Sequence, residues 1–383
     1  MNDKTQPDPQ EEPIKAAAEP ESDYKPQSAK KLARGIALAL LFGILVNGLI
    51  GIFLDGEKLL SSVSQVSPWI IIVPFACQFG LILINALRTV LIGRHFSQRI
   101  SPADSFINSM LGVFFNALTP MAAGGQPFQI YHLQRHGFEA KTATNIIFSR
   151  FVVNAMALLT VLLFSIPKII QIAGSVTIGA FVFYLGLIVT FSFAIFFLIV
   201  LINPTIIGRI SLKLRHNRLG TWIGKISKKP NWSLSLMKWT HSLRTEIQFL
   251  WSEKLSTMIT DVFLNFLVIF LEGLAVFYPV YMLAGQSIGL LDSIVTFIIV
   301  WQVVFYIPTP GASGTIEGFF ALVFAGLTGL PEQTLIAVIS WRIGTYYLII
   351  LLGLLTTFWY LKRDHVSLPK NGHENTNPQT PTP

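Results

Sequence analysis

Three ionisable side chains lie inside long apolar stretches of this sequence, where charge is rare. Arg150 lies in FSRFVVNAM, Arg342 lies in SWRIGTYYL, and Glu317 follows the glycines of PTPGASGTIEG. A charged side chain at the centre of a membrane helix costs about 2.5–3.5 kcal/mol on insertion scales, so it usually faces a partner or a cavity. A guanidinium can bind a phosphate through two parallel hydrogen bonds, and a carboxylate can pair with it. These residues are therefore the first candidates for a binding site inside a membrane.

Two stretches rich in Gly and Pro interrupt the apolar segments near these charges. TPMAAGGQP begins at Thr119, and TPGASGTIE begins at Thr309, 190 residues later. A helix broken inside a bilayer exposes backbone groups, which is tolerated only where they face protein or a water-filled cavity. The half-helix starting at Gln126 and Pro127 would offer free N–H groups to an anion such as a lipid phosphate. The remaining candidates for substrate binding are glycines and one proline of these stretches: Gly124, Gly125, Pro310, Gly311 and Gly314.

Other charges have competing explanations. Arg88 ends an apolar segment, where a snorkelling interfacial anchor explains it better than a binding role. Glu272 lies mid-segment in VIFLEGLAVF, where a substrate site and a helix–helix hydrogen bond explain it equally well. Glu317 could cap its own helix, pair with Arg342 or carry a coupling proton. No spacing of His and Cys residues matches a metal site, so we expect neither a metal ion nor another cofactor.

Composition indicates an integral membrane protein. Of the 383 residues, 52% are hydrophobic and only 13% are charged, which is far more apolar than a soluble protein of this length. The formal charge of +8 could indicate nucleic-acid binding, but the Lys and Arg residues fall between apolar segments, as in cytoplasmic loops. The single cysteine, Cys77, excludes a disulfide framework. We therefore expect no nucleic acid as a partner.

The apolar segments predict an all-α protein with about eight hydrophobic segments. About 20 apolar residues can cross a bilayer, whereas shorter runs are more often re-entrant or buried. Six segments are long enough to cross: 34–54, 68–92, 142–165, 176–202, 257–283 and 334–360. Two others, 104–133 and 292–330, are broken by Pro and Gly and are predicted to be re-entrant hairpins of broken helices. Lys and Arg near the segment ends place both chain termini in the cytoplasm.

The common spacing of the two hairpins predicts an internal repeat. Repeat 1, residues 34–165, contains hairpin 104–133, and repeat 2, residues 166–361, contains hairpin 292–330. Each repeat would hold two spans, a hairpin and a third span, and the two would enter the membrane from opposite faces. Inverted-topology repeats of this kind build transporters around a midplane site made by discontinuous helices.

Three regions are predicted to lie in the cytosol. The tails, 1–33 and 362–383, are polar and cannot build a core, which predicts disorder. The insertion 204–254 is strongly basic and contains SLSLMKWTHSLRTEIQFLWSEK, in which apolar residues such as Trp239 and Ile247 share one helical face. A basic amphipathic helix is typical of a segment that lies on the anionic inner leaflet. Membrane lipids, most of all anionic headgroups, are therefore the expected partners.

The motifs together resemble a known family. TPMAAGGQPFQIYHLQRHG followed by FSRFV, and PTPGASGTIEG followed by SWRIG, are similar to the lysylphosphatidylglycerol synthase transmembrane, or flippase-like, family of bacterial and archaeal membrane proteins. NALRTVLIGR fits the same family, and the resemblance covers about 34–361. It implies that Gly124, Gly125 and Pro127 belong to the first family motif. The second motif falls on Pro308, Pro310, Gly311, Gly314 and Glu317, and the two arginines inside the spans are Arg150 and Arg342.

The sequence departs from the family pattern at two positions. Gln126 stands where an acid is common, and Ala312 stands where a second glycine is usual, so only one hairpin carries a carboxylate. In the family, a soluble domain transfers the amino acid and the membrane half moves the product. We expect the membrane half alone here, which implies lipid movement and no enzyme activity.

Two functions follow from these observations. The first is a lipid flippase or transporter of the bacterial cytoplasmic (inner) membrane, which moves an anionic phospholipid or a polyprenyl-phosphate-type lipid. The second is a non-transporting membrane subunit of a lipid-modifying or glycosyl-transfer system. A scaffold for other membrane proteins would need no charge inside the membrane. A partner enzyme and a second copy of the chain both remain open as partners.

Overall fold

The structure is a computed structural model that describes residues 67–366, with short gaps. The gaps lie at 97, 120–121, 123, 176–179, 203–204, 215–216, 218–219, 222–231, 286–287, 306 and 308–313. The tail 1–33, the first predicted span 34–54 and most of the tail 362–383 fall outside the described residues. Pro308, Pro310 and Gly311 of the second motif fall outside them too.

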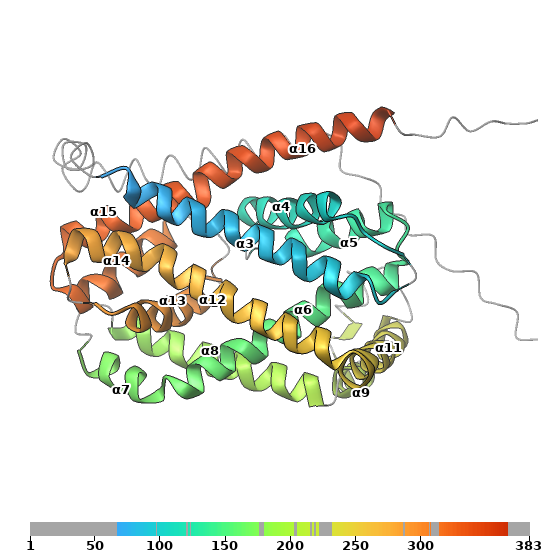
Figure 1. Ribbon diagram of the computed structural model, residues 1–383. Coiled ribbons are helices and arrows are strands. Elements are labelled where there is room, and N and C mark those ends of the chain that lie inside the picture. The colour runs from blue at the N-terminus through green and yellow to red at the C-terminus, as the bar shows by residue number, and fades with distance from the viewer. Residues whose placement is uncertain are drawn as a thin grey trace, which may run out of the picture.

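Helices form every regular element of the described residues (Figure 1). The first half contains α3 (Trp69–Gly93), α4 (Pro102–Leu118), α5 (Gly125–Arg135), α6 (Ala140–Phe164), α7 (Ile166–Ser175) and α8 (Ala180–Ile202). The second half contains α9 (Thr205–Leu214), α11 (Trp232–Glu253), α12 (Leu255–Ala284), α13 (Leu290–Phe305), α14 (Thr315–Thr328), α15 (Pro331–Arg342), the π-helix η1 (Ile343–Tyr347) and α16 (Leu348–Val366). The predicted all-α class is confirmed.

Among the described residues, four helices are long and apolar enough to cross a membrane. They are Trp69–Gly93, Ala140–Phe164, Leu255–Ala284 and the continuous segment Pro331–Tyr360, and they match four of the predicted spans. The predicted span 176–202 corresponds to α8, of which Ala180–Ser192 also ranks among the shorter apolar helices. The total of six spans and the re-entrant path of the hairpins stay predictions.

The order of helices in the first part of the chain recurs in the second. A long helix, two shorter helices separated by a break, and a second long helix appear as α3 to α6 and again as α12 to α16. The first residues of the corresponding helices are 186 to 191 residues apart, which agrees with the 190-residue spacing of the two motifs. Each break falls where Gly and Pro were predicted to interrupt a helix.

The two long helices that begin these halves, α3 and α12, lie side by side across the centre of the bundle (Figure 1). Gly80 faces Leu271, and Arg88 contacts Asp261, so the chain runs in opposite directions along the two helices. Antiparallel packing of corresponding helices is the arrangement that an inverted repeat would require. We call the interface between α3 and α12 the seam.

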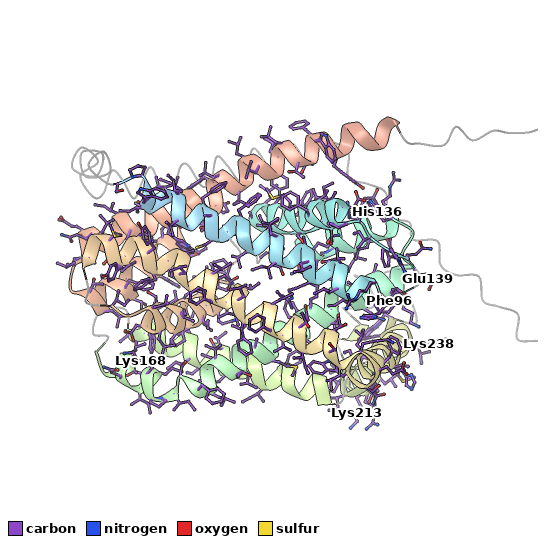
Figure 2. The ribbon with its side chains drawn as sticks, viewed as in Figure 1. Phe96, His136, Glu139, Lys168, Lys213 and Lys238 are labelled. Carbon is purple, nitrogen blue, oxygen red and sulfur yellow. The ribbon has the colours of Figure 1, made fainter. Side chains whose placement is uncertain are left out.

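One end of the bundle carries the polar connections. Figure 2 shows Phe96, His136, Glu139, Lys213 and Lys238 at this end, whereas Lys168 lies at the opposite end. The helices α9 and α11 of the basic insertion pack against each other here. Ile247 and Leu250 of α11 are buried against α6 and α12, so part of the predicted leaflet-facing surface packs inside the protein instead.

Candidate functional site

The break of the first hairpin is closed by side chains. Asn116 accepts a hydrogen bond from the backbone N–H of Gly125 (2.8 Å), and Thr119 accepts one from Gly124 (2.8 Å). The N–H groups of both glycines are therefore occupied, and the predicted anion site at the helix start, Gln126 and Pro127, stays a prediction. The sequence shows an interrupted helix but not the acceptors that satisfy it, because those lie at the end of the preceding helix.

The close approach of the end of α4 to the start of α5 explains why positions 124 and 125 are both glycine. A Cβ on Gly125 would clash with the Asn116 side chain and the Gly112 carbonyl, and one on Gly124 would clash with Thr119. Beside them Ala122 adopts a positive φ of 48°, which is strained for a residue with a side chain. The helix α5 begins at Gly125, one residue before the predicted start, with Gln126 half-buried and Pro127 exposed.

Glu317 organises the second hairpin. Gly314 has a φ of 84°, and its N–H donates to Oε2 of Glu317 (2.7 Å) at the start of α14. Oε1 of the same carboxylate accepts a hydrogen bond from Nε of Arg342 (3.0 Å). The Glu317 side chain is fully buried, and Arg342 is 4% exposed. Two of the predicted roles, the helix cap and the pair with Arg342, are thus present together.

Arg342 links the two halves of the chain through Tyr346. The guanidinium carbon lies 3.9 Å from the centre of the Tyr346 ring, which is a cation–π contact. The Tyr346 hydroxyl donates to the carbonyl of Ala117 at the end of α4 (3.2 Å). Arg342 lies directly before η1 and Tyr346 lies within it, and π-helical turns of this kind are frequent at functional sites.

A cavity of about 240 Å³ lies beside this pair. The two hairpins border it through Asn116, Ala122 and Ile307, and α12 contributes Glu272. Aromatic rings form much of its wall: Phe297, Trp301, Trp341 and Tyr346. Pockets that combine an apolar lining with a few polar groups are the usual form of small-ligand sites.

Glu272 is an ionisable side chain that lines the cavity and has no partner among the described residues. It lies on α12 near the middle of the helix, half-buried, and it makes no hydrogen bond or ion pair with another described residue. The helix–helix hydrogen bond considered for it from the sequence is therefore absent from the described residues. We call Arg342, Glu317 and Glu272 the cavity cluster.

A second group of charges lies along the seam. Arg88 donates two hydrogen bonds to Asp261, from Nε to Oδ1 (2.7 Å) and from Nη2 to Oδ2 (3.1 Å), and a third to Asn265. Arg88 is 3% exposed and Asp261 is fully buried. The prediction that Arg88 is a snorkelling anchor is wrong, because the antiparallel partner helix brings a carboxylate opposite it.

Arg150 belongs to this second group and does not line the cavity. It donates from Nη1 to Thr89 (2.6 Å) and from Nη2 to Asn85 (2.6 Å), both on α3. Its Nε is buried without a hydrogen-bond partner among the described residues. We call Arg88, Arg150 and Asp261, with their polar neighbours Asn85, Thr89 and Asn265, the seam cluster. The two arginines that were expected at one site thus lie in separate clusters.

Several polar residues of α3 and α12 were not predicted as site residues, although their spacing in the sequence indicates a shared polar face. On α12, Thr257, Asp261, Asn265 and Glu272 follow one another at intervals of four, four and seven residues, which places them on one helical face. On α3, Gln78, Asn85, Arg88 and Thr89 are separated by seven, three and one residues, which also places them on one side of the helix. A polar face on an otherwise apolar span indicates a buried polar contact or a pathway.

His95 and Arg94 mark one end of this polar face. Nε2 of His95 lies 2.8 Å from the Thr257 hydroxyl, which also accepts a hydrogen bond from Nη2 of Arg94 (3.2 Å). Burial, and then the nearby charges of Arg94 and Lys254, lower the pKa of His95 below its ordinary value. A metal site is not formed by these or other described residues, since no three His, Cys, Asp or Glu side chains gather suitably.

Comparisons with known proteins agree with this arrangement. A family model described as the lysylphosphatidylglycerol synthase TM region matches residues 36–353. A UPF0104 membrane protein of Archaeoglobus fulgidus is 23% identical over 328 residues, which are 85% of this chain and 96% of that protein. No solved structure matches the chain. Because the family model spans most of its length, the chain belongs to the lysylphosphatidylglycerol synthase TM region family.

Proposed function

We propose that this protein is a flippase that moves a lipid headgroup from one leaflet to the other. The observation that carries the proposal is the cavity, which both interrupted hairpins border and which is lined by Glu272 and by Arg342, the partner of Glu317. Ionisable groups inside a membrane protein usually line a path for a polar substrate. The substrate class that we favour is an anionic phospholipid or a polyprenyl-phosphate-type lipid.

The repeated order of helices supports this proposal. In our interpretation α4 with α5, and α13 with α14, are re-entrant hairpins that enter from opposite faces and meet at the cavity. Two inverted halves of similar stability can exchange conformations, so that the cavity opens first to one face and then to the other. The apolar helices would stay in contact with lipid throughout, and only the headgroup would travel through protein.

The polar end of the bundle supports an orientation. Arg94, His136 and Lys213 lie at the ends of helices, and Lys238 of α11 lies at the same end of the bundle (Figure 2), where a basic excess is typical of the cytoplasmic face. We infer that this end faces the cytoplasm, with both chain termini on the same side, in a cytoplasmic membrane. The insertion with α9 and α11 would then contact the anionic inner leaflet through the part of its apolar surface that is not buried against α6 and α12.

The test is leaflet exchange in liposomes that contain the purified full-length protein. Fluorescent anionic phospholipids are incorporated into both leaflets, and a reductant that cannot cross the membrane bleaches those in the outer leaflet, so lipids of the inner leaflet stay protected unless they exchange. We expect the wild type to abolish protection, and Arg342→Gln and Glu317→Gln to slow exchange by about tenfold or more, because each loses a charge-assisted hydrogen bond. Glu332→Gln, an exposed carboxylate on the same helix as Arg342, is the matched control.

Two results would contradict the proposal. If Arg342→Gln and Glu317→Gln exchange lipid as fast as the wild type, the cavity is not on the path. If the folded wild type exchanges none of a broad set of lipids, the protein is not a flippase on its own. The second result would favour the membrane subunit of a lipid-modifying or glycosyl-transfer system.

A further inference from the structure

We propose that Arg150, with Arg88 behind it, is a binding station for a phosphate group, distinct from the cavity. This inference rests on the proposed function for the origin of the phosphate, which would be a lipid headgroup on its path along the seam. The binding itself is a property of the seam cluster and can be measured without any transport.

The charges of the seam cluster do not balance. It contains two guanidinium groups, on Arg88 and Arg150, and one carboxylate, on Asp261. Arg88 binds both oxygens of that carboxylate, and the hydrogen bonds of Arg150 to described residues go to Thr89 and Asn85 instead of Asp261. A buried charge without a counter-charge is strongly unfavourable, and an anion that binds there would remove the imbalance.

The contacts of Arg150 favour an incoming phosphate. Within the part of the chain that the structure describes, its two terminal nitrogens donate to the neutral oxygens of Thr89 and Asn85, and its Nε has no hydrogen-bond partner. Hydrogen bonds from a guanidinium to a phosphate are roughly twice as strong as those to neutral acceptors and can form in parallel pairs. A phosphate that approached Arg150 would therefore compete well with Thr89 and Asn85. The side chain is only half-buried, so the structure does not seal it off.

The cavity cluster is less suited than Arg150 to bind the same phosphate. Its cluster holds two carboxylates, Glu317 and Glu272, against the single guanidinium of Arg342, whose Nε already binds Glu317. A phosphate in the cavity would have to compete with a carboxylate for Arg342, whereas at Arg150 it competes only with neutral acceptors, so it binds more strongly at Arg150.

The two clusters are close enough to serve one headgroup. Gln78 of the cavity and Asn85 of the seam cluster are seven residues apart on α3, and Asn265 and Glu272 are seven apart on α12. Seven residues are two helical turns, or about 10 Å. A headgroup that leaves Arg150 along the seam would reach the cavity within this distance.

Anion-dependent stabilisation of the full-length protein in detergent tests the station. Thermal unfolding is followed with increasing inorganic phosphate, and separately with a short-chain phosphatidic acid, against chloride at equal ionic strength. Ligands that bind only the folded state raise its melting temperature with concentration. We expect the wild type to be stabilised by both phosphate compounds, or by the lipid alone if the acyl chains are also needed. Chloride should have no such effect.

Variants locate the effect. Arg150→Gln should weaken the affinity for phosphate by about tenfold or more, whereas Arg150→Lys should retain part of it because it keeps the charge. Arg342→Gln is the matched arginine variant, and it should bind phosphate with unchanged affinity although we expect it to lose lipid exchange. All variants should give the same circular dichroism and elution volume as the wild type.

The station would be refuted if neither phosphate compound stabilises the wild type beyond chloride. It would also be refuted if Arg150→Gln and the wild type bind with equal affinity, or if Arg342→Gln loses binding as Arg150→Gln does. Failure of the proposed function gives a different pattern, in which phosphate binds through Arg150 but liposomes show no exchange.

Discussion

The cavity cluster and the seam cluster use the same chemistry with opposite balances of charge. In the cavity cluster, Glu317 pairs with Arg342 and the carboxylate of Glu272 is left unpaired. In the seam cluster, Asp261 pairs with Arg88 and the guanidinium of Arg150 is left without a carboxylate. Each cluster thus has a structural ion pair and one further charge. We therefore expect the paired residues to contribute most to stability and the residues without an oppositely charged partner to contribute to substrate binding rather than to stability.

The largest effect expected from this comparison is on Asp261. Asp261→Leu should lower the free energy of unfolding by about 3–5 kcal/mol, because it leaves Arg88 buried without a counter-charge. Thermal unfolding in detergent measures the loss. The double variant Arg88→Met with Asp261→Leu should recover most of it, since no uncompensated charge of the pair then remains. Equal instability of the single and double variants would show that the pair is not what matters at this position.

A smaller effect is expected when the pair of the cavity cluster is broken. Glu317→Ala removes both the pair with Arg342 and the cap of Gly314, which should cost about 2–3 kcal/mol of unfolding free energy. Glu317→Gln can still accept the Gly314 hydrogen bond and should cost about half as much. The cavity beside Arg342 lets water reach it, which limits both losses. If Glu317→Ala destabilises the protein more than Asp261→Leu does, the ranking of the clusters is wrong.

Substitution of Gly125 by alanine tests whether a change beside the cavity also affects the seam cluster. Gly125→Ala would force the Asn116 side chain and the Gly112 carbonyl apart, at a cost of about 1–3 kcal/mol. Gly318→Ala is the matched control, because no atom lies within 4 Å of its added Cβ and alanine is favoured within a helix. Lipid exchange should fall for Gly125→Ala and stay unchanged for Gly318→Ala. Phosphate binding at Arg150 should survive both, and its loss in Gly125→Ala would show that the clusters are coupled.

The fold could largely be predicted from the sequence because its signals are local. Apolar length predicted the helices α3, α6 and α12, and the Gly and Pro motifs predicted both breaks to within a few residues. The amphipathic pattern of α11 was also visible, but the pattern alone does not distinguish a lipid surface from a protein surface. Ile247 and Leu250 therefore lie against α6 and α12, where only the tertiary structure could place them.

The site was harder to predict because its contacts join distant parts of the chain. The sequence indicated Arg342 and Glu317 correctly as a pair, since both follow from one motif and one span. It did not indicate that Asp261 opposes Arg88, because 173 residues separate them and only the antiparallel seam brings them together. The same packing moved Arg150 from the expected common site to the seam cluster. The spacing of polar residues along α3 and α12 could have predicted these contacts only in part. It identifies the polar face of each helix but not the helix against which that face packs.

The smallest effect on stability is expected for Glu272, and this makes it the sharpest test of the comparison. Glu272→Gln removes no ion pair and no hydrogen bond between described residues, so the unfolding free energy should change by less than about 0.5 kcal/mol. Lipid exchange should nevertheless fall, because the amide keeps the shape of the cavity but not the charge that faces the headgroup. A parallel measurement on Glu332→Gln, which is exposed, should show neither change. If Glu272→Gln leaves both stability and exchange unaltered, the absence of a partner for an ionisable side chain beside the cavity is not evidence of function. The distinction between paired and unpaired residues would then be wrong for Glu272, where it gives its clearest prediction.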